Sequence, residues 1–190
     1  MTLSGDRVLI VDDDKVVRLL IRTALKRYGM VVEEATDGAM LVECFHRFQP
    51  DIILLDAVMP GVDGFDACMQ LRRVPGGQHV PVIMLTGLAD EESIERAYEC
   101  GSTDFFIKGP QVGLLAHRMR YVLRTSRMRA ELARSREMLT KAQRIARLGS
   151  WQWNFAERLV HASDETCGLL GLTCDDIGVP EQTFVERLWP

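Results

Sequence analysis

The sequence predicts an α/β fold in which a five-stranded, doubly wound parallel sheet is covered by helices on both faces. Two observations lead to this prediction. Five short strand-like runs recur within residues 1–110, and each is followed by aspartate, threonine or lysine. The segments between them have the periodicity of amphipathic helices and are joined by short loops. Such strict alternation is typical of parallel strands linked by helical crossovers.

The strands are expected over residues 8–11, 31–35, 52–55, 82–85 and 105–107. Two of them, Val8–Val11 and Ile52–Leu55, are continuously apolar, which is typical of strands buried on both faces. Both runs end abruptly at carboxylates. In open parallel sheets, binding and chemistry collect at the carboxyl ends of the strands. The residues that follow the strands are therefore the first candidates for a functional site.

The intervening helices are expected over residues 15–28, 38–48, 65–72 and 91–100. Asp14 and Asp37 precede the first two, where an aspartate side chain accepts hydrogen bonds from the free N–H groups of a helix start. Gly29 and Gly101 follow the first and fourth helices, because glycine readily adopts the left-handed conformation that ends many helices. In the first helix, the positions expected on the apolar face are Val16, Leu19, Leu20, Thr23, Ala24 and Leu25.

Five polar residues are expected at the carboxyl edge of the sheet: Asp12, Asp13, Asp56, Thr86 and Lys108. Three crowded carboxylates repel one another unless a hard divalent cation such as Mg²⁺ neutralises them. Asp56 is then both a metal ligand and the nucleophile for phosphoryl transfer, a reaction that depends on positioning and charge neutralisation. Lys108 contributes a mobile positive charge, Thr86 a hydroxyl donor, and Gly87 leaves the approach open. Singly, each is more often a loop or turn residue, but their convergence in one topology favours a site.

Residues 1–110 resemble the receiver domain of two-component response regulators, which has a flavodoxin-like fold. Asp12 and Asp13 match the family's acidic pair, and Asp56 matches its phosphoacceptor. Thr86 matches the switch hydroxyl, Lys108 the conserved-motif lysine, and residues 59–64 the loop after the phosphoacceptor. Phe105 matches the aromatic switch that turns inward when Thr86 is drawn toward the phosphate.

The resemblance also implies chemistry and partners. A histidine kinase or phosphotransfer protein donates the phosphoryl group to Asp56, and Asp12, Asp13, Asp56 and the backbone carbonyl of Val58 hold Mg²⁺, with Mn²⁺ as a second ion that fits. Phosphorylation switches the face formed by the fourth helix, fifth strand and fifth helix. The chain itself is then a phosphoacceptor and not a metabolic enzyme.

One position departs from the family's pattern. The family usually has proline directly after the lysine, whereas Gly109 stands here between Lys108 and Pro110. A cis peptide bond without proline costs about 2.5–4 kcal/mol, so the geometry of this segment stays open. The side chains of Val58 and Leu88 border the expected phosphate site, and neither can hold an attacking water. They predict slow self-dephosphorylation.

Residues 111–148 are expected to form the fifth receiver helix, continued as a coiled-coil signalling helix that pairs two protomers into a homodimer. The segment carries 10 basic and 2 acidic side chains, against 11 and 18 in residues 1–110. Its seam residues alternate at spacings of three and four, with a phase break near Thr125: Leu115, Met119, Val122, Met128, Leu132, Ser135, Leu139 and Ala142. The excess arginine also fits a nucleic-acid-binding stripe. The lack of a helix-turn-helix break and of interleaved aromatics favours a partner-facing helix.

Residues 149–190 are expected to be an incomplete α+β segment that resembles the start of a PAS sensor domain. The resemblance rests on the run from Ala146 to Trp151 and on Ser163-Asp164-Glu165. We expect an aromatic-rich strand within residues 148–154, a second strand at Val160–Ala162 and a short helix around Asp164–Leu170. The tryptophans fit ordinary core aromatics better than a cofactor site.

The remaining sequence features bear on location and on the competing function. No apolar stretch approaches the roughly 18 residues that a membrane span needs, and the first residues lack the pattern of a signal peptide. Five cysteines without metal-ligand spacing are expected to be reduced thiols in a cytoplasmic protein. The alternative function is the regulatory N-terminal part of a larger cyclic-di-GMP synthase or phosphodiesterase, or of a hybrid histidine kinase, since none of their catalytic motifs occurs in residues 1–190.

Overall fold

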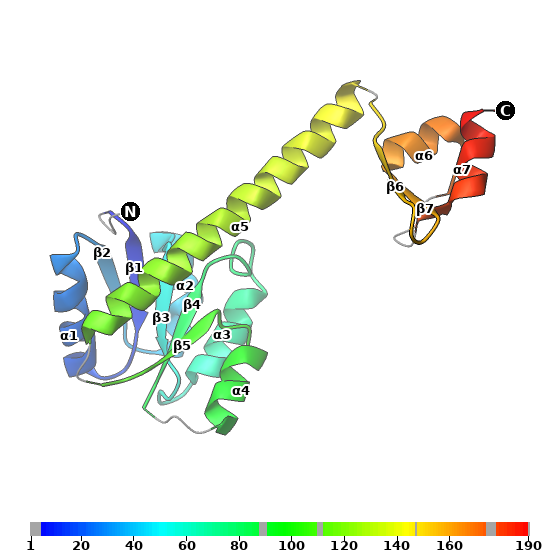
Figure 1. The fold of residues 1–190 in the computed structure, drawn as a ribbon. Coiled ribbons are helices and arrows are strands. Elements are labelled where there is room, and N and C mark those ends of the chain that lie inside the picture. The colour runs from blue at the N-terminus through cyan, green and yellow to red at the C-terminus, as the bar shows by residue number, and fades with distance from the viewer. Residues whose placement is uncertain (1–4, 88–90, 110–111, 147, 174–177, 190) are drawn as a thin grey trace. The chain divides into compact units, whose positions relative to one another are not determined.

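The computed structural model describes the chain apart from residues 1–4, 88–90, 110–111, 147, 174–177 and 190. The chain divides into two compact units, Met1–Arg129 and Ala130–Pro190. The first unit contains the predicted sheet, with strands β1 (Arg7–Val11), β2 (Val31–Ala35), β3 (Ile52–Asp56), β4 (Val82–Thr86) and β5 (Asp104–Ile107). All neighbours pair in parallel, in the order β2-β1-β3-β4-β5 (Figure 1). The predicted fold class is confirmed.

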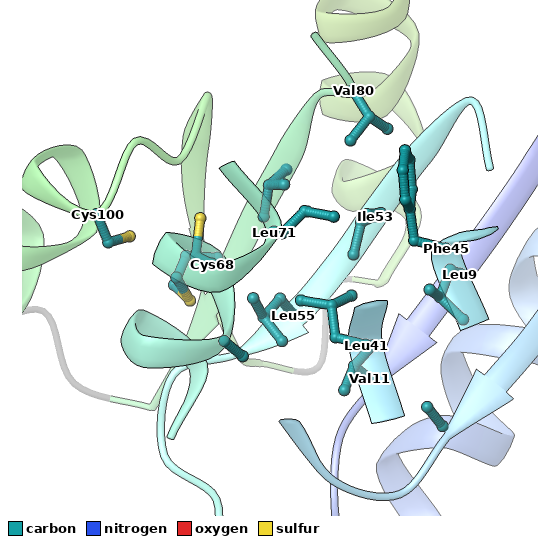
Figure 2. Close-up of a cluster of buried hydrophobic side chains, with 14 of the residues drawn as sticks. Leu9, Val11, Leu41, Phe45, Ile53, Leu55, Cys68, Leu71, Val80 and Cys100 are labelled. Carbon is teal, nitrogen blue, oxygen red and sulfur yellow. The ribbon is translucent and has the colours of Figure 1, made fainter. Parts of the chain in front are cut away.

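Helices cover both faces of this sheet, as a doubly wound fold requires. One face packs against α2 (Leu41–Phe48), α3 (Gly64–Arg72) and α4 (Glu91–Glu99), and Figure 2 shows part of that core. The other packs against α1 (Lys15–Arg27) and the first part of α5 (Val112–Ala146). Successive strand residues alternate between the two cores: Leu9 and Val11 face α2 and α3, whereas Val8 and Ile10 face α1 and α5. This alternation explains why β1 is apolar throughout.

The helix ends follow the capping residues that the sequence predicts. The Asp14 side chain accepts hydrogen bonds from the N–H groups of Val16 and Val17 at the start of α1. Asp37 accepts one from Ala39, but it begins a 3₁₀ turn, Gly38–Met40, and α2 starts only at Leu41. Gly29 lies in the left-handed region with φ of 74°. The predicted helix over residues 38–48 is therefore two elements, because the tight turn after Asp37 uses i→i+3 bonds.

The apolar face predicted for α1 is only partly buried. Val16, Leu19 and Leu20 are 63%, 48% and 56% exposed. Leu25, one of the predicted positions, is buried, together with Arg18 and Ile21, which the prediction did not include. Counting apolar residues fails here because an arginine occupies a position on the buried face, and three large apolar side chains are left on the surface.

The second unit contains a small antiparallel sheet of order β6-β7-β8. Its strands are β6 (Trp151–Asn154), β7 (Leu159–Ala162) and β8 (Val179–Pro180), and its helices besides the end of α5 are α6 (Asp164–Leu170) and α7 (Glu181–Leu188). Val160, Val179 and Phe184 form its core, with Trp153 packed against them. The predicted strands and α6 are confirmed. The sequence analysis did not predict β8 or α7. A strand of two residues such as β8 carries no periodic signal.

The cysteines correct one further expectation. Cys44, Cys68 and Cys100 are free thiols in the first unit, but Cys167 of α6 is disulfide-bonded. An odd number of cysteines excludes complete pairing but does not exclude one bridge. Across the described ranges, no helix is both long and apolar enough to span a membrane.

Candidate functional site

The sheet brings the predicted polar residues to one edge. Asp56 and Thr86 are the last residues of β3 and β4, while Asp12 and Lys108 come directly after β1 and β5. The parallel registers of these four strands place their carboxyl ends side by side. The residues that lie far apart in the sequence are thus brought together by the topology alone.

Three carboxylates form the centre of this edge. One oxygen from each of Asp12, Asp13 and Asp56 lies within 4.8 Å of the others. Asp12 is fully buried and Asp56 is 5% exposed, whereas Asp13 is open to solvent. Asp12 Oδ1 accepts a hydrogen bond of 2.8 Å from the Asp14 N–H. An all-oxygen cluster of this kind, open on one side, is the donor set that a hard divalent cation takes.

Lys108 supplies the positive charge of the cluster. Its Nζ lies 2.8 Å from Asp12 Oδ2 and 2.8 Å from Asp56 Oδ1. The backbone N–H of Lys108 donates a 2.7 Å hydrogen bond to the Thr86 carbonyl, which fixes the end of β5 against β4. The Lys108–Gly109 peptide bond is trans, since none of the peptide bonds in the described residues is cis. The ammonium therefore reaches both carboxylates with an ordinary backbone at this position.

The electrostatic environment of the cluster shifts the pKa of Asp56 and the pKa of Lys108. Burial raises the pKa of the Asp56 carboxyl above its ordinary value, while the hydrogen bond and charge of Lys108 oppose the rise. Burial would lower the pKa of Lys108, but its hydrogen bonds with Asp12 and Asp56 outweigh that effect and leave the pKa raised. Lys108 is thus held as a cation, and Asp56 is a carboxylate whose charge is only partly compensated.

The residues beside the carboxylates leave access to Asp56. Thr86 is buried, and a Cβ added at the exposed Gly87 would meet no atom within 4 Å. Phe105 is half-buried on β5, and the edge of its ring packs against Tyr98 of α4, with ring centroids 6.1 Å apart. The sequence did not identify Tyr98, because its position in α4 carries no signal of this contact.

Val58 lies next to the cluster, with its N–H 3.4 Å from Asp56 Oδ1. Its side chain is 73% exposed, so it borders the approach without closing it. Leu88, the other residue expected to affect phosphate lifetime, lies outside the described residues.

Two residues that support the cluster were missed by sequence reasoning. A Cβ on Gly64, the first residue of α3, would lie 1.9 Å from the carbonyl oxygen of Asp56, so only glycine lets α3 begin this close to β3. Arg18 of α1 is 8% exposed and donates to the carbonyl oxygens of Asp12 and Asp13. Its spacing to Ile21 and Leu25 was the available signal, because an arginine on a buried face needs polar partners.

Comparison with known proteins agrees with this fold class. The chain belongs to the response regulator receiver domain family, whose model matches residues 8–120. It is 33% identical over 135 residues to the DNA-binding dual master transcriptional regulator RpaA of Synechocystis, covering 71% of this chain and 56% of RpaA. It is 40% identical over 117 residues to the transcriptional regulatory protein CseB of Streptomyces coelicolor, covering 62% of this chain and 49% of CseB.

The fold is also similar to a solved structure of a receiver domain. The receiver domain of a sensor histidine kinase from Pseudomonas aeruginosa, determined with a magnesium ion in its active-site cleft, is 28% identical with a TM-score of 0.59. The likeness covers 63% of this chain and 98% of that domain. The chain spans about half the length of the curated relatives it matches.

Proposed function

We propose that the first unit is the phosphoacceptor module of a two-component phosphorelay and that Asp56 is the acceptor. One observation carries the proposal. A carboxylate at the end of the central strand lies 2.8 Å from an ammonium and within 4.8 Å of two further carboxylates. A nucleophile for phosphoryl transfer needs neutralisation of the charge on the moving group, and this arrangement supplies it from two sides.

Asp12, Asp13 and Asp56, with the backbone carbonyl of Val58, would hold one Mg²⁺ or Mn²⁺. The fit rests on an oxygen-only donor set and on the open side at Asp13, since Mg²⁺ keeps several of its waters. The magnesium-bound receiver domain from Pseudomonas aeruginosa is in keeping with this assignment. When bound, the cation neutralises the carboxylates and the charge on the transferred group.

The chain's own residues have distinct tasks in the transfer. Ionised Asp56 forms the new O–P bond as the N–P bond of a donor phosphohistidine breaks. Lys108 moves from its ion pairs to an oxygen of the phosphoryl group, and Thr86 donates its hydroxyl to another. Phe105 and its neighbour Tyr98 on α4 then carry the change to the face formed by α4, β5 and α5. That step biases a two-state surface by the new contacts of the phosphate.

The donor is a histidine kinase or a phosphotransfer protein that docks on α1. Val16, Leu19 and Leu20 form an exposed apolar face of this helix. A hollow next to that face is lined by Leu20, Phe106 and Lys108 among others, so it lies beside the acceptor site. Exposed apolar side chains that border a reaction site fit a partner protein better than solvent.

Residues 111–148 serve as a dimerising helix that passes the switch to an output. Leu132 and Leu139, one heptad apart in α5, are 54% and 62% exposed. Pairing with a second copy would cover them. A second candidate function is the regulatory N-terminal part of a larger cyclic-di-GMP synthase or phosphodiesterase or of a hybrid histidine kinase. It is favoured by the PAS-like segment over residues 149–190 and its small antiparallel sheet.

The central test is incubation of the chain with acetyl phosphate and Mg²⁺, followed by intact mass spectrometry. We expect one phosphoryl-sized gain in mass, lost in Asp56→Ala. The matched control is Asp51→Ala, which removes an aspartate at the opposite end of the same strand and should keep the gain. No gain in the wild-type chain, or a gain that survives Asp56→Ala, would overturn the proposal. Light scattering on the same samples reports whether phosphorylation changes the oligomeric state.

A further inference from the structure

Arg18 of α1 contacts both the loop after β1 and the neighbouring strand β2. Its guanidinium Nη1 donates to two consecutive backbone carbonyls, 2.6 Å to Asp12 and 3.0 Å to Asp13. Its Nε donates to Glu34 Oε2 of β2 at 3.2 Å. The side chain is only 9% exposed, so these bonds form where water cannot replace them.

Glu34 orients this guanidinium. It also pairs with Arg22, whose Nη1 lies 2.9 Å from Glu34 Oε1. Glu34 sits on β2 opposite Ile10 of β1, so a rigid strand fixes its place. The contacts Arg22–Glu34–Arg18 therefore link α1 and β2 to the loop that carries two of the three site carboxylates.

That loop has few other restraints on the side of Asp13. Asp12 continues the strand ladder weakly, with its N–H 3.3 Å from the Ala35 carbonyl, and its side chain is buried. Asp13 is exposed, and its carboxylate would move outward from two neighbouring negative charges if its backbone were free. A guanidinium whose Nη1 binds two successive carbonyls while its Nε is held by Glu34 is suited to prevent that movement.

We propose that Arg18 is a positioning residue that holds the Asp12–Asp13 backbone so that both carboxylates reach a divalent cation. The proposal rests on the proposed function only in assuming that the three carboxylates bind such a cation. Arg18 does not touch the cation or the phosphoryl group. Glu34 has two tasks: it aims the guanidinium and it cancels a positive charge that would otherwise repel the metal.

The direction in which one substitution changes cation affinity distinguishes a positioning role of Arg18 from a purely electrostatic one. Arg18→Gln removes a positive charge near the carboxylates, which by Coulomb's law alone should tighten cation binding. Loss of positioning should weaken it. Groups that orient metal ligands typically contribute about 10–100-fold in affinity, so we expect Arg18→Gln to weaken Mn²⁺ binding about tenfold despite the lost charge. Arg18→Lys keeps one nitrogen donor for the carbonyls but loses the separate Nε contact with Glu34, so its Mn²⁺ affinity should lie between those of the wild type and Arg18→Gln.

The test is titration of the full chain with Mn²⁺, with free ion measured by electron paramagnetic resonance. Arg47→Gln is the matched control, because Arg47 pairs with Glu33 on the same strand but contacts neither aspartate. It should bind Mn²⁺ like the wild type. Asp13→Asn should abolish binding. In the acetyl phosphate reaction, Arg18→Gln should need more Mg²⁺ for half-maximal rate yet reach the wild-type plateau, which a general structural defect would lower.

The outcomes distinguish the two proposals. Arg18→Gln with wild-type or tighter Mn²⁺ affinity, while Asp13→Asn loses binding, would overturn the role of Arg18 and leave the phosphoacceptor site intact. A wild-type chain that binds no Mn²⁺ would overturn both. If circular dichroism finds Arg18→Gln unfolded, Arg18→Lys and Glu34→Gln decide the question. Affinity of both within twofold of wild type would then contradict the inference.

Discussion

Lys108 Nζ lies 2.8 Å from Asp56 Oδ1 and at the same distance from Asp12 Oδ2, so one ammonium serves two buried carboxylates. The lysine side chain is 25% exposed, while those of Asp56 and Asp12 are 7% and 0% exposed. The negative charge is thus partly compensated by a side chain that can move toward solvent, beside two carboxylates that cannot. Without a phosphoryl group, the Lys108 ammonium pairs with the two carboxylates. When Asp56 is phosphorylated, the same ammonium can move to contact the phosphoryl group.

Lys108→Met is expected to destabilise the first unit in the presence of EDTA near neutral pH, by several degrees in Tm. Two carboxylates would face each other without a counter-charge, and breaking such a buried pair is costly. Added Mg²⁺ should recover much of the loss. Circular dichroism or calorimetry is the suitable measurement, because all three tryptophans lie in residues 151–189 and their fluorescence reports on the second unit. Lys141→Met, which removes an exposed ammonium, is the control; equal effects of the two would contradict the prediction.

Asp56→Asn is expected to raise Tm by a few degrees in EDTA at neutral pH. Burial raises the pKa of Asp56, so the folded protein binds a proton there more readily than the unfolded chain does. Ionised Asp56 therefore costs stability above its folded pKa, and the amide removes that cost. The advantage of Asn should shrink as the pH falls through the raised pKa. Asp51→Asn serves as control, and a destabilised Asp56→Asn at neutral pH would refute the sign.

The lysine contributes with the opposite dependence. Its pKa is raised in the folded state, so its stabilising effect is fully present below its ordinary pKa of about 10.4 and is lost only as the pH rises through the folded value. Between neutral and weakly acidic pH the Asp56 effect therefore dominates. Melting curves of the wild-type chain and Asp56→Asn at a series of pH values, all in EDTA, resolve the two contributions.

Some features of the fold and the site can be predicted from the sequence and others cannot, depending on whether they leave a pattern of apolar and polar residues. Apolar runs that end on Asp12 and Asp56 predict both the strands and the edge where the site lies, because burial on two faces leaves a plain pattern. The burial of Arg18 leaves a weaker signal, its spacing to Ile21 and Leu25, because the contacts that accommodate a buried arginine come from β2 and from the loop before α1. For the same reason, the apolar periodicity of α1 did not reveal that Val16, Leu19 and Leu20 are exposed. Sequence periodicity identifies faces, and only tertiary contacts decide which face is buried.

Gly64→Ala is expected to cost about 3 kcal/mol or more in stability. The added Cβ would lie 1.9 Å from the Asp56 carbonyl oxygen and 2.8 Å from its carbon, and both are backbone atoms that cannot turn aside. The matched control is Gly113→Ala in α5, where the Cβ would meet no atom within 4 Å. Since alanine favours a helix over glycine by about 1 kcal/mol, this control should be neutral or stabilising. Urea unfolding followed by circular dichroism measures both, and similar values for the two would show that α3 can shift away from β3.

Val58→Asn is expected to shorten the lifetime of the phosphorylated protein several-fold. The Val58 side chain is 73% exposed beside Asp56, so the substitution should leave stability within about 0.5 kcal/mol of the wild type. An apolar side chain there cannot hydrogen-bond a water for attack on the phosphoryl group, whereas an amide can orient one. The measurement is the decay of the phosphoryl mass after acetyl phosphate is removed, with Mg²⁺ kept present. Val58→Ala is the control, since it opens the same space without adding a polar group. If Ala accelerates the decay as much as Asn, access of water rather than its orientation limits the reaction, and the proposed role of the side chain's polarity is wrong.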